Sequence, residues 1–230
     1  MLKERGSKTE DGRWVSSAAD RNKQVILALL STVLPDHGLI AEIASGPGQH
    51  IIYFAENCPN LNWQPTEPDD DLRNSIVRNI DLSPSKNILP PVKLNVLDEH
   101  WQLPKVDLIF NANMIHVSPP AATSALMMGV SRHLKSGNRY FQYGPFIHQG
   151  EFNSEGNQDF HQTLGEINPD WGLREIDDVI SLANNHQFDY NRSGLNETLR
   201  TAKDYGIGVA GLGYEDEVRK PLLLDVAGVP

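Results

Sequence analysis

The chain has 230 residues, of which 39% are hydrophobic and 22% charged, and its formal net charge at pH 7 is -10. This length suits one sizeable domain, and the composition is typical of a soluble globular protein. The acidic balance, with no cluster of lysine and arginine, argues against a nucleic-acid partner, because a phosphate backbone is bound by a basic surface. A small-molecule or protein partner is expected instead.

The cysteine content and the amino terminus bear on the compartment. Cys58 is the only cysteine, which excludes an internal disulfide and a multi-cysteine metal site. Residues 1–14 are polar and lack the apolar core of a signal peptide, and the run VILALLSTVL is about half a membrane span. We expect a mobile amino terminus, a cytoplasmic location with the nucleus left open, and no membrane partner.

Helix-like and strand-like patterns alternate from residue 17 to residue 144. The first expected helix shows a capping-box pattern at Ser17 and Asp20 and should end before Pro35. Gly137 is the expected C′ residue of the helix that begins near residue 120. This alternation predicts an α/β fold, a mostly parallel sheet with helices on both faces. The expected helices cover residues 17–34, 49–58, 69–80 and 120–137, and the expected strands 39–44, 61–67, 92–98, 106–115 and 139–144.

The pattern weakens after Pro145. Residues 146–158 are expected to form a polar loop and residues 176–187 a helix. Residues 188–193 and 220–226 are candidate strands, and the glycine-rich stretch GIGVAGLG is ambiguous. No linker marks a second domain.

A glycine-rich loop, ASGPG at residues 44–48, connects the first expected strand to a helix. In a doubly wound sheet such a loop lies at the carboxyl ends of the strands, where ligands bind. A P-loop requires a lysine after the glycines, and none is present. A dinucleotide loop requires a third glycine where this chain has Ile51, so NAD and FAD are disfavoured.

The third alternative is the loop of class I S-adenosylmethionine (SAM) methyltransferases, with the pattern acid–x–G–x–G–x–G. Glu42, Ala44, Gly46 and Gly48 fit this pattern, with alanine in place of the first glycine. An acid at this position suits the α-ammonium group of SAM better than it suits a pyrophosphate.

Two further acids end expected strands. Glu67 lies 19 positions beyond Gly48 (67 − 48), close to the spacing of the carboxylate that accepts hydrogen bonds from ribose hydroxyls. Asp98 ends the third expected strand, where class I methyltransferases commonly place an acid or amide for the adenine amino group. The structural alternative is that these carboxylates cap the helices that follow the strands. Together the acids favour SAM over other nucleosides.

Six segments together resemble the methyltransferase-like 26 family, a domain of unknown function with a SAM-methyltransferase fold: AADRNKQVIL, EIASGPGQH, NWQPTEPD, NANMIHVSP, YGPF and NPDWGLREIDDV. The resemblance covers about residues 14–188. It implies a seven-stranded, doubly wound class I methyltransferase domain over residues 15–190, with SAM as the cofactor, and brings no established substrate. Residues 191–230 do not resemble the family's ending, and their contribution to the sheet is left open.

Methyl transfer depends mainly on proximity and alignment, and a general base helps only when the acceptor must lose a proton. The end of the fourth strand supplies Asn113, a candidate contact to the cofactor backbone, and His116, a candidate base because imidazole titrates near neutrality. Tyr143 ends the fifth strand and is a second catalytic candidate. The alternatives are a packing or capping role for His116 and a core position for Tyr143.

Other polar residues bear on cofactor and metal binding. Arg21 and Asn22 would usually form a solvated helix face, but the resemblance suggests that they reach the cofactor carboxylate. The histidines at 148, 161 and 186 fit no compact ligand spacing, so no metal is expected. Residues 154–164 with the NPDWG turn are a candidate lid.

The sequence therefore favours a SAM-dependent methyltransferase that acts on a small molecule or, second, on a protein. The competing interpretation is a non-catalytic SAM-fold protein that acts through protein partners, which the alanine in the glycine loop and the lack of an N/D-P-P-Y motif support. An NAD-type oxidoreductase is the third alternative.

Overall fold

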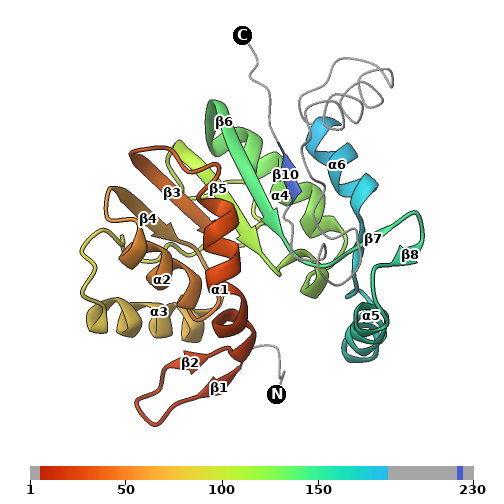
Figure 1. Cartoon of the computed structure of the whole chain (residues 1–230), viewed down its shortest axis with the longest axis horizontal. Coiled ribbons are helices and arrows are strands. Elements are labelled where there is room, and N and C mark those ends of the chain that lie inside the picture. The colour runs from red at the N-terminus through yellow and green to blue at the C-terminus, as the bar shows by residue number, and fades with distance from the viewer. Residues whose placement is uncertain (1–5, 186–221, 225–230) are drawn as a thin grey trace. The chain divides into compact units, whose positions relative to one another are not determined.

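The computed structural model describes residues 6–185 and 222–224 (Figure 1). The chain divides after Ala112 into two compact units, each of which is described by itself. The first unit carries the glycine loop, and the second begins at Asn113.

The first unit is built on three parallel strands, β3 (Gly38–Ile43), β4 (Leu61–Pro65) and β5 (Val106–Ala112), in the order β5-β3-β4. Glu42 is in register with Pro65 on one side and Phe110 on the other. Because the strands are parallel, the segments that follow their carboxyl ends gather at one edge of the sheet. The expected strands at 39–44, 61–67 and 106–115 are thus confirmed.

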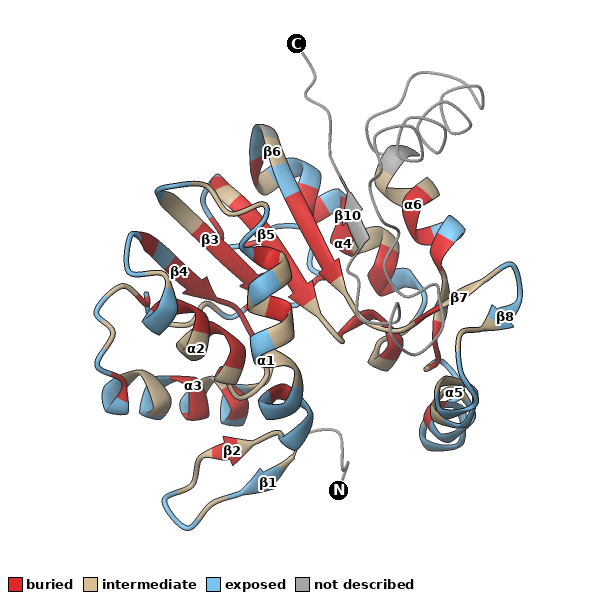
Figure 2. Ribbon diagram, in the orientation of Figure 1, coloured by how far each residue is buried: buried red, intermediate tan, exposed pale blue. Residues whose placement is uncertain are grey.

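Three helices cover this sheet: α1 (Ser17–Leu30), α2 (Gln49–Asn57) and α3 (Asp70–Leu82). The core is aromatic where α2 meets the strands, since the Phe54 ring lies 5.9 Å from the Trp63 ring and 5.6 Å from the Phe110 ring. Figure 2 shows buried residues along the middle of β3 and β5, in agreement with their high apolar content.

The first helix differs from its prediction at both ends. Its N-cap is Ser16, not Ser17, because Ser16 is extended and its hydroxyl accepts the Ala19 N–H at 3.3 Å. The helix ends at Leu30, before the predicted residue 34. The hydroxyls of Ser31 and Thr32 bond back to helix carbonyls, each at 2.7 Å, and such bonds compete with continuation of the helix.

The predicted third strand at residues 92–98 is not a regular strand. The chain instead runs beside β4 over residues 87–92, with backbone bonds from Trp63 to Asn87 and from Val92 to Pro65 and only two isolated bridges. Pro90 and Pro91 lack the N–H groups that a continuous ladder needs, so the pairing is interrupted.

The amino-terminal segment was expected to be mobile, but residues 7–15 form a hairpin of β1 (Ser7–Lys8) and β2 (Trp14–Val15). Trp14 anchors it on α3, because its backbone N–H donates to Ser75 Oγ and its indole N–H to Asp71 Oδ2, both at 2.9 Å. Trp14 is buried, which the apparently polar segment did not suggest.

The second unit begins with a short 3-10 helix, η2 (Ile115–Val117), and the helix α4 (Ala121–His133). The strand β6 (Leu134–Tyr143) follows at once, so the helix predicted over 120–137 is too long and Gly137 lies inside the strand. The reason is that Leu134 has an extended backbone and buries its side chain.

β6 pairs antiparallel with β10 (Leu222–Leu224), which confirms a strand within residues 220–226. The candidate strand at 188–193 and the GIGVAGLG stretch lie outside the described residues.

A second sheet in this unit has the order β8-β7-β9, from β7 (Phe146–His148), β8 (Glu151–Phe152) and β9 (Arg174–Glu175). The polar loop predicted over 146–158 is therefore wrong. Gln149 and Gly150 have φ of 52° and 80°, which suits the tight turn of a β-hairpin better than a loose loop.

Two helices complete the described part of the second unit, α5 (Glu155–Ile167) and α6 (Ile176–Asn185). The predicted lid segment lies largely in α5, which Ser154 caps by accepting the Asn157 N–H. The helix expected from residue 176 is confirmed, with Ile176, Val179 and Ile180 buried. Among the residues that the structure describes, no helix is both long and apolar enough to cross a bilayer.

Candidate functional site

The glycine loop of the first unit turns through three left-handed residues. Ala44, Gly46 and Gly48 have φ of 57°, 56° and 86°. A Cβ on Gly48 would lie 3.0 Å from Ile76 Cγ1, so helix packing requires this glycine. A Cβ on Gly46 would meet nothing within 4 Å, so this glycine faces open space that a ligand could fill.

The left-handed Ala44 makes the alanine in the loop a source of strain. A left-handed alanine costs about 1–2 kcal/mol, while glycine loses about 0.5–1 kcal/mol more entropy on folding. Ala44→Gly is therefore expected to raise the free energy of unfolding by up to about 1 kcal/mol, as measured by urea denaturation. Ala41→Gly, in the regular strand β3, is the matched control and should lower the free energy of unfolding. A lower free energy of unfolding for both variants would contradict the assignment of strain to Ala44.

Hydrogen bonds to neighbouring segments fix the shape of this loop. The Ser45 N–H donates to the Thr66 carbonyl and the Thr66 hydroxyl donates to the Glu42 carbonyl, both at 2.8 Å. Asn79 of α3 donates to the Pro47 carbonyl at 2.9 Å. Sequence reasoning missed Thr66 and Asn79; Thr66 could have been noticed as a hydroxyl beside the predicted acid, whereas Asn79 gave no signal.

Glu67 lies directly against the loop. Its Oε2 accepts the Gly46 N–H at 2.9 Å and its Oε1 accepts the Asp69 N–H at 3.1 Å. The side chain is buried, with 5% of the residue exposed. The structure thus brings Glu67 and the glycines together as the spacing suggested, and the binding of a ribose by this carboxylate stays a prediction.

His50 lies between Glu42 and Asn22 and contacts both residues. Glu42 Oε1 lies 3.6 Å from His50 Nδ1, and His50 Nε2 lies 2.8 Å from Asn22 Oδ1. The other carboxylate oxygen of Glu42 is buried and has no hydrogen-bond partner among the described residues. An unpaired buried carboxylate oxygen is costly, so this atom is suited to a donor that a ligand would bring.

Two other predicted cofactor residues lie at the surface of the described part of the chain. Arg21 is exposed on α1. Asp98 is exposed and does not end a strand; its N–H donates to the Asn95 carbonyl at 3.0 Å. Their roles in cofactor binding stay predictions.

The second unit holds a separate group of predicted residues. Asn113 has a left-handed φ of 59°, and its N–H donates to the Tyr143 carbonyl at 2.9 Å. A Cβ on Gly144 would lie 3.7 Å from both Asn113 Oδ1 and His116 Nδ1, so these two polar atoms flank one small space. Gly144 was not singled out from the sequence, although it stands in the YGPF segment.

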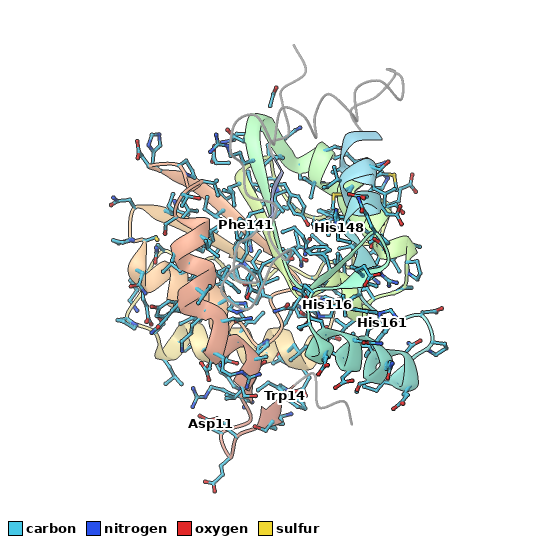
Figure 3. All side chains as sticks on the ribbon, turned by 45° about the vertical axis from the view of Figure 1, so that its right-hand side comes forward. Asp11, Trp14, His116, Phe141, His148 and His161 are labelled. Atoms are coloured by element: carbon cyan, nitrogen blue, oxygen red, sulfur yellow. The ribbon has the colours of Figure 1, made fainter. Side chains whose placement is uncertain are left out.

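His116, labelled in Figure 3, is buried in the second unit. Burial and, second, the nearby positive charge of Arg174 lower the pKa of its imidazole from 6.5 to about 4. Its Nδ1 is buried and has no hydrogen-bond partner among the described residues, and the Phe160 ring packs edge-on at 5.4 Å. Neutral at physiological pH, His116 has one ring nitrogen able to accept a proton.

Arg174 holds the backbone around His116. Its guanidinium donates to the carbonyls of Ile115 at 3.3 Å, Ser118 at 2.5 Å and Asp170 at 3.0 Å. Burial lowers the pKa of Arg174, although the negative charge of Asp170 opposes this effect. Sequence reasoning missed Arg174, which stands 58 positions from His116 (174 − 116).

The other histidines lie on different elements, as Figure 3 shows for His148 and His161. His148 belongs to β7, while His161 of α5 accepts the Leu173 N–H at 3.1 Å. No group of three or more His, Cys, Asp or Glu residues within the described ranges could hold a metal ion, and His186 lies outside these ranges.

Solved structures share this fold. An O-methyltransferase family protein from Burkholderia thailandensis matches with a TM-score of 0.64 and 13% identity, over 76% of this chain and 53% of that one. Human N-acetylserotonin methyltransferase in complex with SAM matches with a TM-score of 0.60 and 14% identity, over 76% of this chain and 48% of that one. CalO1, a methyltransferase in calicheamicin biosynthesis in its SAH-bound form, matches with a TM-score of 0.59 and 12% identity, over 72% of this chain and 48% of that one.

The chain therefore has a methyltransferase-like α/β fold with a mostly parallel central sheet, and it spans about half the length of these solved proteins. Residues 13–193 match the family described as "Protein of unknown function (DUF938)", and the chain belongs to this family.

Proposed function

We propose that this protein is a SAM-dependent methyltransferase that acts on a small-molecule acceptor. The observation that carries the proposal is the open side of Gly46 beside two buried carboxylates, those of Glu42 and Glu67. The solved methyltransferases that share the fold add support. The seven-stranded, doubly wound layout and the relationship to the methyltransferase-like 26 family are part of the same proposal.

The residues of the first unit fit the charges of SAM. The unpartnered Oε2 of Glu42 would accept a hydrogen bond from the α-ammonium group, and Glu67 would accept hydrogen bonds from the ribose hydroxyls. Gly46 leaves room because it has no side chain. We assign the adenine amino group to Asp98 and the carboxylate to Arg21 and Asn22 on the strength of the family resemblance.

His116, Asn113 and Tyr143 are our candidates for acceptor binding and chemistry. When bound, SAM supplies a methyl group on a sulfonium leaving group, so the chain itself needs only to orient the acceptor and remove its proton. His116 is our candidate for this role because its Nδ1 has no hydrogen-bond partner among the described residues, although a pKa of about 4 makes its imidazole a weaker base than one that titrates near neutrality. Asn113 and Tyr143 are the other candidates for binding or chemistry in this unit, and the acidic chain favours a small molecule over nucleic acid.

The experiment is methyl transfer from methyl-labelled SAM to the small-molecule fraction of a cell extract. Gly46→Ala is expected to lower the labelling at least tenfold, because the added methyl group enters the space assigned to SAM. Gly150→Ala is the matched control, since Gly150 also has a positive φ, of 80°, and a Cβ there would also meet nothing within 4 Å. Both variants should lose similar stability from backbone strain. Labelling that is absent in the wild type, or equal in both variants, would contradict the proposal.

A further inference from the structure

One face of helix α3 holds the amino-terminal hairpin of β1 and β2 in the first unit (Figure 1). Asp71, Ser75 and Asn79 are spaced four positions apart along α3, so they lie in a row on the same face of the helix. Asp71 and Ser75 accept the indole and backbone N–H groups of Trp14, each at 2.9 Å. Asn79 Oδ1 accepts a hydrogen bond from Arg13 Nη1 at 3.3 Å. The hairpin is therefore attached along more than two turns of α3.

Asn79 also reaches the glycine loop, because its Nδ2 donates to the Pro47 carbonyl at 2.9 Å. The two partners determine which way this amide points. A guanidinium can only donate and a carbonyl can only accept, so Asn79 presents its oxygen to Arg13 and its amino group to Pro47. Arg13 is held in turn by Asp11, whose carboxylate accepts from its Nε at 2.7 Å. One side-chain amide thus joins the hairpin to the loop.

The peptide group between Pro47 and Gly48 is held at both of its ends. Its N–H donates to the Ser45 carbonyl at 2.9 Å, and its carbonyl accepts the hydrogen bond from Asn79. Because proline has no N–H, the backbone of Pro47 can be hydrogen-bonded only through this carbonyl. The peptide stands one position beyond Gly46, so its orientation helps to shape the open space that we assign to SAM.

We propose that Asn79 and Arg13 are positioning residues for the cofactor, through which the amino-terminal hairpin holds the glycine loop in its binding conformation. The inference rests on the proposed function, in which this loop binds SAM. When the loop leaves that conformation, the apparent Kd rises as the fraction of binding-competent chains falls. The loss of one neutral hydrogen bond corresponds to roughly two- to tenfold weaker binding.

The test is calorimetric titration of the full chain with S-adenosylhomocysteine (SAH). Asn79→Ala should raise the Kd roughly two- to tenfold. Asn74→Ala is the matched control, since Asn74 is an exposed asparagine on the same helix, and it should bind SAH as the wild type does. The titration is made at a temperature at which urea denaturation shows every variant to be folded, so that lower stability alone leaves the Kd unchanged.

Two further variants separate the bonds that Asn79 makes. Asn79→Asp keeps an acceptor for Arg13 but places a carboxylate oxygen against the Pro47 carbonyl, so SAH affinity should fall at least as far as in Asn79→Ala while the hairpin stays attached. Arg13→Ala should weaken SAH binding by itself, and it keeps the test available if the Asn79 variants fold poorly. Because Arg13 acts through Asn79, it should add no further loss in the Asn79→Ala background, a non-additivity that lower stability does not produce.

The outcomes separate the two proposals. The same Kd for SAH in Asn79→Ala and the wild type, or independent losses from Arg13→Ala and Asn79→Ala, would overturn the positioning role and leave the cofactor assignment intact. No binding of SAH by the wild type would contradict the cofactor assignment and this inference together.

Discussion

Replacing Glu67 with alanine is expected to abolish the stabilisation of this protein by SAM. The carboxylate accepts the Gly46 N–H at 2.9 Å and is the group that we assign to the ribose hydroxyls. Each hydrogen bond to a charged group contributes about 1.5–3 kcal/mol, so the loss of the bonds to two ribose hydroxyls should weaken binding at least about 100-fold. The measurement is the Kd for SAH by calorimetry, beside the midpoint of thermal unfolding.

Two controls separate ribose binding from support of the loop. Thr66→Val removes the hydroxyl bond from Thr66 to the Glu42 carbonyl, at 2.8 Å, and leaves the carboxylate of Glu67 in place. Its effect on the Kd should be well below that of Glu67→Ala. Glu99→Ala removes an acid whose side chain is 84% exposed, and it should change nothing. Equal losses for the first two variants would show that Glu67 acts only through the loop.

Acid should destabilise the second unit through His116. The pKa of this buried imidazole is lowered from 6.5 to about 4, so between these values the unfolded chain binds more protons than the folded chain. The contribution of the neutral ring is fully present above pH 6.5 and is lost as the pH falls toward 4. A shift of this size corresponds to roughly 3 kcal/mol of unfolding free energy.

Urea denaturation at several pH values measures this effect. His116→Gln should lose less stability than the wild type between pH 6.5 and 4, by the same roughly 3 kcal/mol. His100→Gln, at a largely exposed position, should keep the pH dependence of the wild type. If the wild type and His116→Gln followed the same curve, His116 would not be held neutral by its surroundings.

The parts of the fold that the sequence predicted are those in which periodicity and local signals agree. β3, α2 and β4 follow from an apolar run, a glycine loop and a second apolar run, and tertiary packing did not override these signals. The predictions of local structure were wrong where contacts between residues far apart in the sequence determine that structure. Trp14 lies in a segment that is polar in sequence, but it is held against α3, where Ser75 and Asp71 accept hydrogen bonds from its two N–H groups.

The candidate site shows the same division. Spacing along the chain predicted that Glu67 would reach the glycines, because parallel strands bring consecutive carboxyl ends together. The link from Asn22 through His50 to Glu42 joins three elements and depends on side-chain direction, which the sequence pattern does not specify. Asp98 was predicted to end a strand over residues 92–98, where the structure has only an isolated bridge at Val92.

The measurement that tests the central claim most directly is thermal unfolding of the purified protein with SAM, SAH or NAD. A ligand at about 100 times its Kd stabilises the folded state by about 2.7 kcal/mol, which in a chain of this size raises the midpoint by several degrees. We predict this rise with SAM and SAH and no rise with NAD. A rise with NAD alone, or with none of the three ligands, would contradict the assignment of the Gly46 loop to SAM.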